Sequence, residues 1–208
     1  ILSGPEYSYS KSDLGSRWTA EYTTFKVWSP VSSSAEVLLY GSVTDAKPET
    51  VAMKRGAKGV WYVRVPGNLH GRYYRYRFHS YGKVRETPDI NCYAAGADSR
   101  LSMVTDLKRT DPKGWPGKAM PTRQSQTEAV IYEVHVRDFT ALPSSGVRPE
   151  WRGKYLGMVE PGTHVPGSGQ ATGIDYLRGL GITDVHLLPI QNSSAGRPGD
   201  YSWGYATT

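Results

Sequence analysis

The sequence predicts a multidomain chain with two fold classes: an all-β sandwich, followed by the first β-α-β unit of a parallel α/β domain. Three observations carry this prediction. Short apolar segments punctuated by glycine or proline fill residues 21–108, prolines and polar residues crowd residues 109–127, and residues 128–208 contain a strand, a helix and a second strand. The first pattern is typical of sandwiches and the last of parallel sheets.

The sandwich is expected to begin after a linker or ragged N-terminus at residues 1–20, where serine, glycine and proline show little apolar periodicity. Its strands are expected within TTFKVWSP (23–30), AEVLLYG (35–41), GVWYVRVPG (59–67) and GRYYRYRFHSYGK (71–83). In the third segment Trp61, Val63 and Val65 share one apolar face, because alternate residues of a strand point the same way. We expect Trp61, and Trp28 in the first segment, to lie in the core.

A basic stretch, GRYYRYRFHSYGKVR, covers residues 71–85 of a chain whose formal net charge is +6. Basic surfaces attract phosphate, which raises the question of a nucleic-acid partner. With a period of two, one face of this stretch carries Tyr74, Tyr76 and Phe78, and the other carries Tyr73, Arg75, Arg77 and His79. No known nucleic-acid module accompanies it, so we predict a solvated strand face and no nucleic-acid partner, with nucleic acid kept as a minor alternative.

Residues 109–127 have the composition of a surface linker, and the pattern changes class beyond them. Strands are predicted over AVIYEVHV (129–136) and ITDVHLLPI (182–190). Between them TGIDYLRGLG (172–181) is a predicted helix, with Thr172 as N-cap, Asp175 as its capping-box partner and Gly181 at the stop. The strands of such a unit are parallel and its connection is right-handed.

One β-α-β unit cannot close a sheet. A (β/α)8 barrel takes about 250 residues, and a doubly wound sheet also needs several strands. We therefore expect the second domain, residues 128–208, to be truncated. Its unpaired strand edges would favour association with the remainder of the domain or with another chain.

Composition excludes several classes of protein. The chain is 38% apolar, enough for a packed core, but no segment approaches the roughly 18 apolar residues of a membrane span, and we predict no membrane partner. The single cysteine, Cys92, excludes an internal disulfide. Isolated His164 and His186 lead us to predict no metal and no cofactor. An extracellular and a cytoplasmic location both stay open.

The candidate site lies in the loops after the two predicted strands of the second domain, because parallel sheets bind ligands at the carboxyl ends of their strands. The second loop contains Tyr201, Trp203 and Tyr205. Tyrosine and tryptophan suit sugar binding, since the ring stacks on an apolar sugar face while the polar edge can hydrogen-bond. Taken alone, Trp203 and Tyr205 would more often be core residues.

Glu133, His135 and Arg137 alternate onto one face of the first predicted strand. A carboxylate beside a histidine could be an acid/base pair, but a satisfied polar layer in the wall of the sheet is the favoured interpretation. We expect Asp138 to fix the backbone of the loop.

Several motifs together resemble a known family. AVIYEVHVRDFT, GKYLGMVEPGT, TGIDYLRGLGITDVHLLPI and YSWGY are similar to the opening of the catalytic barrel in type I pullulanases, debranching enzymes of glycoside hydrolase family 13. FKVWSP, GVWYVRVPGNLHGRYYRYRF and SMVTDLKRTDPKGW resemble the family 48 carbohydrate-binding module that precedes this barrel. The similarity runs from about residue 21 to residue 205. It implies an immunoglobulin-like sandwich followed by the first β-α-β of a (β/α)8 TIM barrel, incomplete in this chain.

The resemblance also implies retaining hydrolysis of α-1,6-glucosidic bonds, which needs two carboxyl groups roughly 5 to 5.5 Å apart. In the family the catalytic carboxylates follow later barrel strands, so we assign no catalytic residue here and expect the chain alone to be inactive. The implied partners are α-glucans: pullulan, amylopectin, glycogen and branched maltooligosaccharides. A non-catalytic α-glucan-binding protein is the alternative, and an isoamylase or branching enzyme is a third.

The family motif Tyr-Asn-Trp-Gly-Tyr corresponds to Tyr201-Ser202-Trp203-Gly204-Tyr205. The resemblance implies that Tyr205 stacks on the glucose at the cleavage site, with Trp203 and Tyr201 as its supports. Ser202 departs from the motif and loses an amide that could brace the loop.

Overall fold

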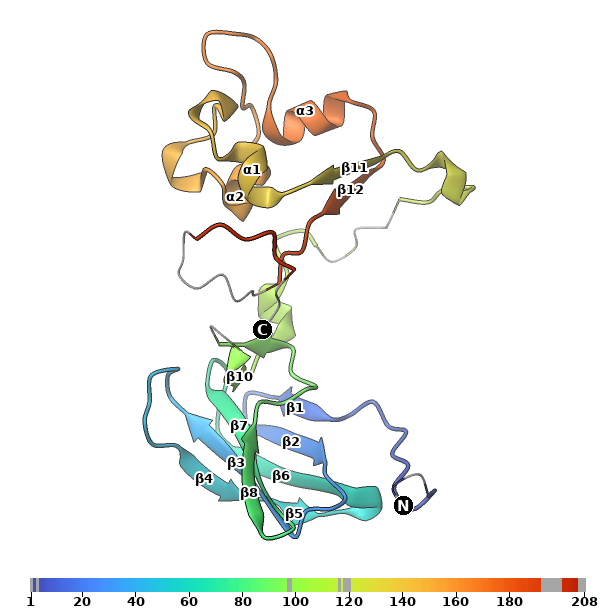
Figure 1. The fold of residues 1–208 in the computed structure, drawn as a ribbon, viewed down its shortest axis with the longest axis vertical. Coiled ribbons are helices and arrows are strands. Elements are labelled where there is room, and N and C mark those ends of the chain that lie inside the picture. Colours follow the sequence, from blue (N-terminus) through green and yellow to red (C-terminus); the bar gives the residue numbers. More distant parts are fainter. Residues whose placement is uncertain are drawn as a thin grey trace. The chain divides into compact units, whose positions relative to one another are not determined.

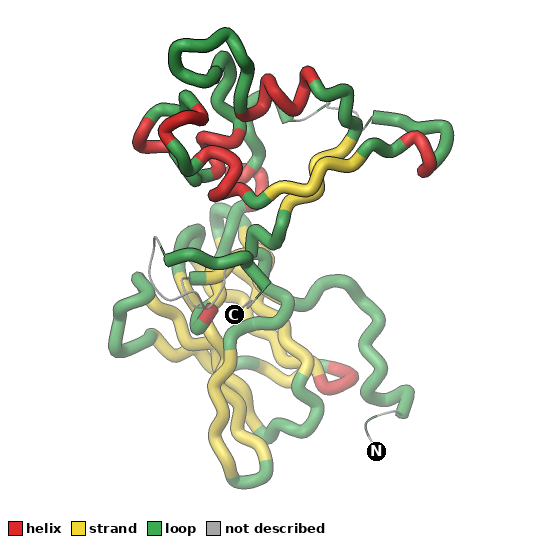
Figure 2. The backbone as a smooth tube through the Cα atoms, turned by 45° about the horizontal axis from the view of Figure 1, so that its top comes forward, coloured by secondary structure: helices red, strands yellow, loops and turns green. Residues whose placement is uncertain are grey.

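The computed structural model describes residues 2, 4–96, 99–115, 117, 121–191 and 200–205. The chain divides into two compact units, Ile1–Lys118 and Ala119–Thr208. Strands dominate the first unit, and most of the helical turns belong to the second (Figures 1 and 2). None of the helices formed by the described residues is long and apolar enough to cross a membrane.

The first unit contains two sheets, and all strand pairs among its described residues are antiparallel. One sheet has the order β1-β2-β6-β5, with β1 Gly15–Trp18, β2 Tyr22–Trp28, β5 Lys54–Arg55 and β6 Val60–Pro66. The other has the order β4-β3-β7-β10-β9, with β8 also paired to β7. Its bounds are β3 Ser34–Tyr40, β4 Glu49–Ala52, β7 Tyr73–Ser80, β8 Lys83–Thr87, β9 Ala94–Ala95 and β10 Ser102–Met103. Short 3-10 turns occupy Ala57–Gly59 and Leu107–Thr110.

The core of this unit lies between the two sheets. Alternate residues of β2, β3, β6 and β7 point into it, namely Phe25, Val27, Val37, Leu39, Trp61, Val65, Tyr74, Tyr76 and Phe78. The predicted faces of the third and fourth strands are therefore confirmed, because a strand places every second side chain on the same side.

Trp28 is not in the core, contrary to the sequence prediction. Trp28 is two residues from Lys26 in β2, so both side chains lie on the outer face of the strand, and 39% of the surface of Trp28 is exposed. Its indole Nε1 donates to the carbonyl oxygens of Tyr7 at 3.1 Å and Lys58 at 3.0 Å. Trp61 is buried as expected and donates to the carbonyl oxygen of Ser29.

β1 lies inside residues 1–20, where composition indicated a linker. Gly15–Trp18 pairs instead along β2, from Gly15 opposite Lys26 to Trp18 opposite Thr23. The strand is only four residues long, so it carries too few side chains for a two-residue period to show in the sequence.

A buried carboxylate, Asp89, connects the loop after β8 to strands β7 and β10 of the second sheet. Its Oδ2 accepts from the hydroxyls of Tyr74 at 2.8 Å and Tyr76 at 3.0 Å, and its Oδ1 accepts from the amide of Asn91 at 2.8 Å. Its own amide donates to Oγ of Ser102 at 2.8 Å. Burial, and then the negative charge of Asp89, raise the pKa of both tyrosines, so both phenols remain protonated donors.

The second unit contains a pair of parallel strands, β11 Ile131–Val134 and β12 Asp184–Leu187. Three short helices lie between them in the chain: α1 Val136–Thr140, α2 Tyr155–Met158 and α3 Gly173–Gly179. There are 3-10 turns at Gln126–Glu128, Pro143–Ser145 and Pro149–Trp151. The apolar core of this unit is built around Val134, Val136, Met158 and Leu177.

The β-α-β order and the helix near residues 172–181 agree with the sequence, but two details do not. β11 ends at Val134, and His135 becomes the N-cap of α1. Thr172 and Asp175 form no capping box: Oγ1 of Thr172 donates to the carbonyl of Ser145, and Asp175 accepts from the amide of Gly162. The described residues hold only this pair of parallel strands, so the expected (β/α)8 barrel is not shown.

We predict that Tyr76→Phe destabilises the first unit, because the change keeps the ring but removes one hydrogen bond to the Asp89 carboxylate. The free energy of unfolding should fall by about 1.5–3 kcal/mol, the range for hydrogen bonds to charged groups, measured by urea denaturation with near-ultraviolet circular dichroism. Tyr81→Phe is the control, because Tyr81 is 83% exposed. Equal stability of the two variants would contradict the role given to Asp89.

Candidate functional site

The loops that follow β11 and β12 meet in the second unit. The residues after β11 form α1, and the segment 200–205 lies downstream of β12. Tyr201 makes the connection: its hydroxyl donates to Oδ2 of Asp138 at 2.9 Å, across a sequence separation of 63 residues. The meeting point therefore lies at the carboxyl ends of paired parallel strands, where parallel sheets bind ligands.

Tyr201 is held by contacts on several sides. The indole Nε1 of Trp203 donates to its hydroxyl oxygen at 2.9 Å. The ring of His135 lies edge-on to its ring, with centroids 5.6 Å apart, and the guanidinium of Arg137 lies 5.5 Å from its ring centroid. Tyr201 and Trp203 thus form one ordered pair anchored on Asp138.

The charge of Asp138 supports this anchor. Nδ1 of His135 lies 2.9 Å from the same Oδ2 that accepts from Tyr201. His135, and then Tyr201 and Arg137, lower the pKa of Asp138, so its carboxyl is ionised at neutral pH. The carboxylate in turn raises the pKa of Tyr201, which keeps the phenol protonated as a donor.

Gly204 fixes the turn between Trp203 and Tyr205. Its φ is +83°, and a Cβ at this position would lie 2.2 Å from the carbonyl oxygen of Pro189. Only glycine fits this approach, because a side chain would need both a left-handed backbone and space that the carbonyl occupies. The amide of Gly204 donates to Oγ of Ser202 at 3.0 Å, so the serine hydroxyl braces the loop where the family motif has asparagine.

The three aromatic candidates are exposed. The exposed fractions are 54% for Tyr201, 62% for Trp203 and 66% for Tyr205. Trp203 and Tyr205 are therefore not core residues, although core packing is the position that their residue types favour. Tyr205 makes no hydrogen bond or ring contact with any other described residue, and it is the most exposed of the three.

The polar residues near the end of β11 differ from the prediction. Glu133, His135 and Arg137 do not share a strand face, because the strand ends at Val134 and α1 begins at Val136. Glu133 is exposed, and the carboxylate beside His135 belongs to Asp138. Asp138 binds side chains rather than the loop backbone. The i, i+3 spacing of His135 and Asp138 indicates this contact only once the segment is known to be helical.

Two further features surround the site. The hydroxyl of Tyr155 in α2 donates to the carbonyl of Ile190, which attaches the segment after β12 to the crossover, the connection between β11 and β12. Asp138 also lines a cavity of about 340 Å³, together with Phe139, Thr172 and Tyr176. Within the described part of the chain, no group of three or more His, Cys, Asp or Glu side chains could hold a metal ion.

Comparison with known proteins gives consistent matches along the chain. Residues 13–94 match the family model "Carbohydrate-binding module 48 (Isoamylase N-terminal domain)". The chain is 37% identical over 202 residues to a pullulanase of Bacillus subtilis (strain 168), an alignment that covers 95% of this chain and 27% of the relative.

Solved structures agree with the sequence match. A pullulanase from Bacillus acidopullulyticus is 37% identical with a TM-score of 0.89, covering 98% of this chain and 25% of that one. A pullulanase from Paenibacillus barengoltzii, in complex with maltohexaose and α-cyclodextrin, is 38% identical with a TM-score of 0.88, covering 98% of this chain and 32% of that one. The chain therefore spans about a quarter to a third of the length of these proteins.

We predict that Gly204→Ala displaces the aromatic loop, because the new methyl group would overlap the carbonyl of Pro189. Strain of this kind costs on the order of 1–3 kcal/mol, so chymotrypsin should cleave after Tyr201, Trp203 and Tyr205 several times faster. Gly179→Ala is the matched control, because its Cβ meets nothing within 4 Å and its φ is not in the left-handed range. Identical cleavage rates would exclude the constraint at Gly204.

The anchor on Asp138 should depend on pH. A carboxyl whose pKa is lowered in the folded state stabilises that state above its ordinary value of about 4, and the contribution is lost as pH falls through the lowered pKa. The fluorescence of Trp203 is obtained by subtracting the spectrum of the Trp203→Phe variant from that of the parent chain. This difference signal should stay constant from pH 8 to about pH 4 and change below pH 4. In Asp138→Asn the difference signal should lack this acid transition. A transition well above pH 4 that persists in Asp138→Asn would contradict the anchor on Asp138.

Proposed function

We propose that this chain, whose residues 13–94 belong to carbohydrate-binding module family 48 and which corresponds to the N-terminal region of pullulanases, is part of an enzyme that hydrolyses α-1,6-glucosidic bonds. The similarity to pullulanases along 95% of the chain is the observation that carries the proposal, because it includes both units and not only the module. A binding module alone would be matched over the first unit.

The chemistry assigned to the whole protein is retaining hydrolysis. It uses one carboxylate as nucleophile and one carboxylic acid as proton donor, roughly 5 to 5.5 Å apart. We assign neither role to a residue of this chain. The domain assignment that goes with this function places a carbohydrate-binding sandwich at 21–108, a linker at 109–127 and the start of a (β/α)8 barrel at 128–208, with β11 and β12 as its first strands.

We assign the aromatic loop to substrate binding. Tyr205 is the stacking residue, and its 66% exposure in the second unit supports this role. Tyr201 and Trp203 act as supports, since the hydrogen bonds from Trp203 to Tyr201 and from Tyr201 to Asp138 set the direction of the loop. The left-handed backbone of Gly204 then forms a turn between Trp203 and Tyr205, so that Tyr205 does not continue the direction of the supporting pair.

The substrates are α-glucans with α-1,6 linkages: pullulan, amylopectin, glycogen and branched maltooligosaccharides. The maltohexaose and α-cyclodextrin named for the Paenibacillus barengoltzii pullulanase support an α-glucan as ligand. The match to a carbohydrate-binding module also favours a second function, non-catalytic glucan binding. Affinity electrophoresis in amylopectin separates the two: retardation without release of reducing ends indicates binding alone.

We predict that Tyr205→Ala in the intact protein lowers kcat/KM for pullulan about tenfold or more, because the stacking ring that stabilises the bound sugar is lost. A tenfold decrease corresponds to roughly 1.4 kcal/mol of lost transition-state stabilisation. Tyr205→Phe should stay close to the parent, because the ring remains. The measurement is the release of reducing ends, with Tyr81→Ala, a substitution of an exposed tyrosine in the first unit, as control.

Two outcomes would count against these assignments. If the intact protein releases no reducing ends from pullulan, the proposed activity is wrong. If the protein is active but Tyr205→Ala matches the parent, only the role of Tyr205 is wrong.

A further inference from the structure

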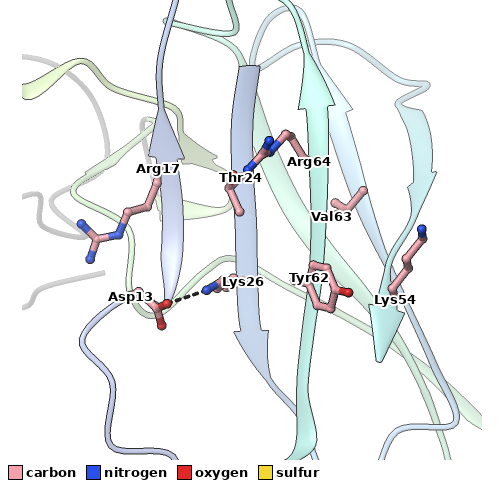
Figure 3. Close-up of a pocket in the computed structure, with 8 residues that line it drawn as sticks. All are labelled: Asp13, Arg17, Thr24, Lys26, Lys54, Tyr62, Val63 and Arg64. Carbon is pink, nitrogen blue, oxygen red and sulfur yellow. Dashed lines mark hydrogen bonds and ion pairs between the residues drawn. The ribbon is translucent and has the colours of Figure 1, made fainter. Parts of the chain in front are cut away.

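The outer face of the β1-β2-β6-β5 sheet carries a pocket that the proposed hydrolysis does not use. Its volume is about 620 Å³, within the usual range of small-ligand sites. The lining residues come from all four strands and from the segment before β1 (Figure 3). They are Asp13, Arg17, Thr24, Lys26, Lys54, Tyr62, Val63 and Arg64.

Strand register arranges these side chains in two rows. Arg17, Thr24 and Arg64 stand opposite one another across β1, β2 and β6, and Lys26, Tyr62 and Lys54 do so across β2, β6 and β5. Neighbouring strands are about 4.8 Å apart and residues two positions apart in a strand are separated by about 7 Å. Tyr62 therefore stands between two lysines about 10 Å apart, with the second row of polar side chains beside it.

The charge of this face is unbalanced. Four basic side chains line the pocket with one carboxylate, Asp13, which pairs with Lys26 at 2.5 Å. Among the described residues, Arg17, Lys54 and Arg64 have no carboxylate partner. The guanidinium of Arg64 lies 4.1 Å from the ring centroid of Tyr22, a contact that fixes its position without neutralising it.

The basic strand β7 of the other sheet shows the opposite arrangement. Arg75 pairs with Glu86 at 2.5 Å, and Arg77 pairs with Glu36 at 3.2 Å and with Glu86 at 2.8 Å. Arg75 and Arg77, in the stretch that raised the question of nucleic acid, are therefore matched by carboxylates on β3 and β8. On the β1-β2-β6-β5 sheet, by contrast, Arg17, Lys54 and Arg64 lie together on one face without such carboxylates.

We propose that the pocket binds phosphate monoester groups carried by an α-glucan, with Tyr62 against a sugar ring and Lys54 and Arg64 beside the phosphate. Tyr62 is 41% exposed and offers a flat apolar surface. Guanidinium and ammonium groups are the side chains that recognise phosphate. The inference rests on the proposed glucan substrate and extends it to phosphorylated chains held away from the aromatic loop.

The geometry favours a decorated sugar over two other ligands. A neutral glucan gives no reason for Lys54 and Arg64, two cations without carboxylate partners among the described residues, beside one ring. A nucleic-acid strand is tracked by a groove with several stacking rings, whereas this pocket contains one tyrosine among its lining residues.

The test compares binding of the intact protein to phosphorylated amylopectin and to the same amylopectin after phosphatase treatment, by affinity electrophoresis. The parent should bind the phosphorylated form about tenfold more tightly, and salt should weaken this preference. Lys54→Gln/Arg64→Gln should remove the preference, and Tyr62→Ala should weaken binding to both forms. Lys83→Gln is the matched control, because Lys83 is an exposed lysine on β8 of the other sheet.

Each contrary result overturns the proposal. Equal binding of the two amylopectins by the parent would exclude phosphate recognition. Full competition by inorganic phosphate, with Tyr62→Ala unchanged, would leave an anion site without glucan. Tighter binding of a single-stranded oligonucleotide would assign the face to nucleic acid. Pullulan carries no phosphate, so its hydrolysis, measured in parallel, tests the proposed function separately.

Discussion

The Asp89 carboxylate is the constraint on which the first unit depends. It is 3% exposed and accepts from Tyr74 and Tyr76, two neighbours on the inner face of β7. A buried charge is tolerated only where hydrogen bonds replace water. The two tyrosine hydroxyls must therefore stay within hydrogen-bond distance of the carboxylate, which fixes the position of β7 relative to Asp89. Phe25 of the opposite sheet packs on Tyr74, with ring centroids 4.9 Å apart. The sheet that carries the basic pocket is therefore supported by side chains whose positions the carboxylate determines.

Much of the first unit could be predicted from sequence because a strand alternates with a fixed period. The inner faces of β6 and β7 follow from that period alone. The same alternation places Trp28 on the outer face of β2, because Phe25 and Val27 occupy the inner face, whereas residue type alone suggested the core. Ion pairing could not be predicted in this way: Arg77 meets Glu36 across 41 positions, and only the register of β3 and β7 brings them together.

In the second unit the order of the elements could be predicted, but the construction of the site could not. The pairing of β11 with β12 agrees with the β-α-β pattern. The anchor between Tyr201 and Asp138, and the approach of Gly204 to Pro189, depend on where two loops meet after folding. The hydroxyl of Thr172, a residue typical of N-caps, is used instead to connect α3 with Ser145, because tertiary contacts can replace a local cap.

The parallel pairing of β11 and β12 also has a kinetic consequence. The amide of Val130 reaches Thr183 across 53 positions, so the chain between them must be closed into a long loop before the two strands gain any contact. The entropy of that closure must be lost before the pairing compensates it, which slows folding. Contacts inside the crossover, such as the bridge between His164 and Ala171, shorten the effective loop. The second unit should thus acquire its order later than the hairpins of the first, which leave the ribosome earlier during synthesis.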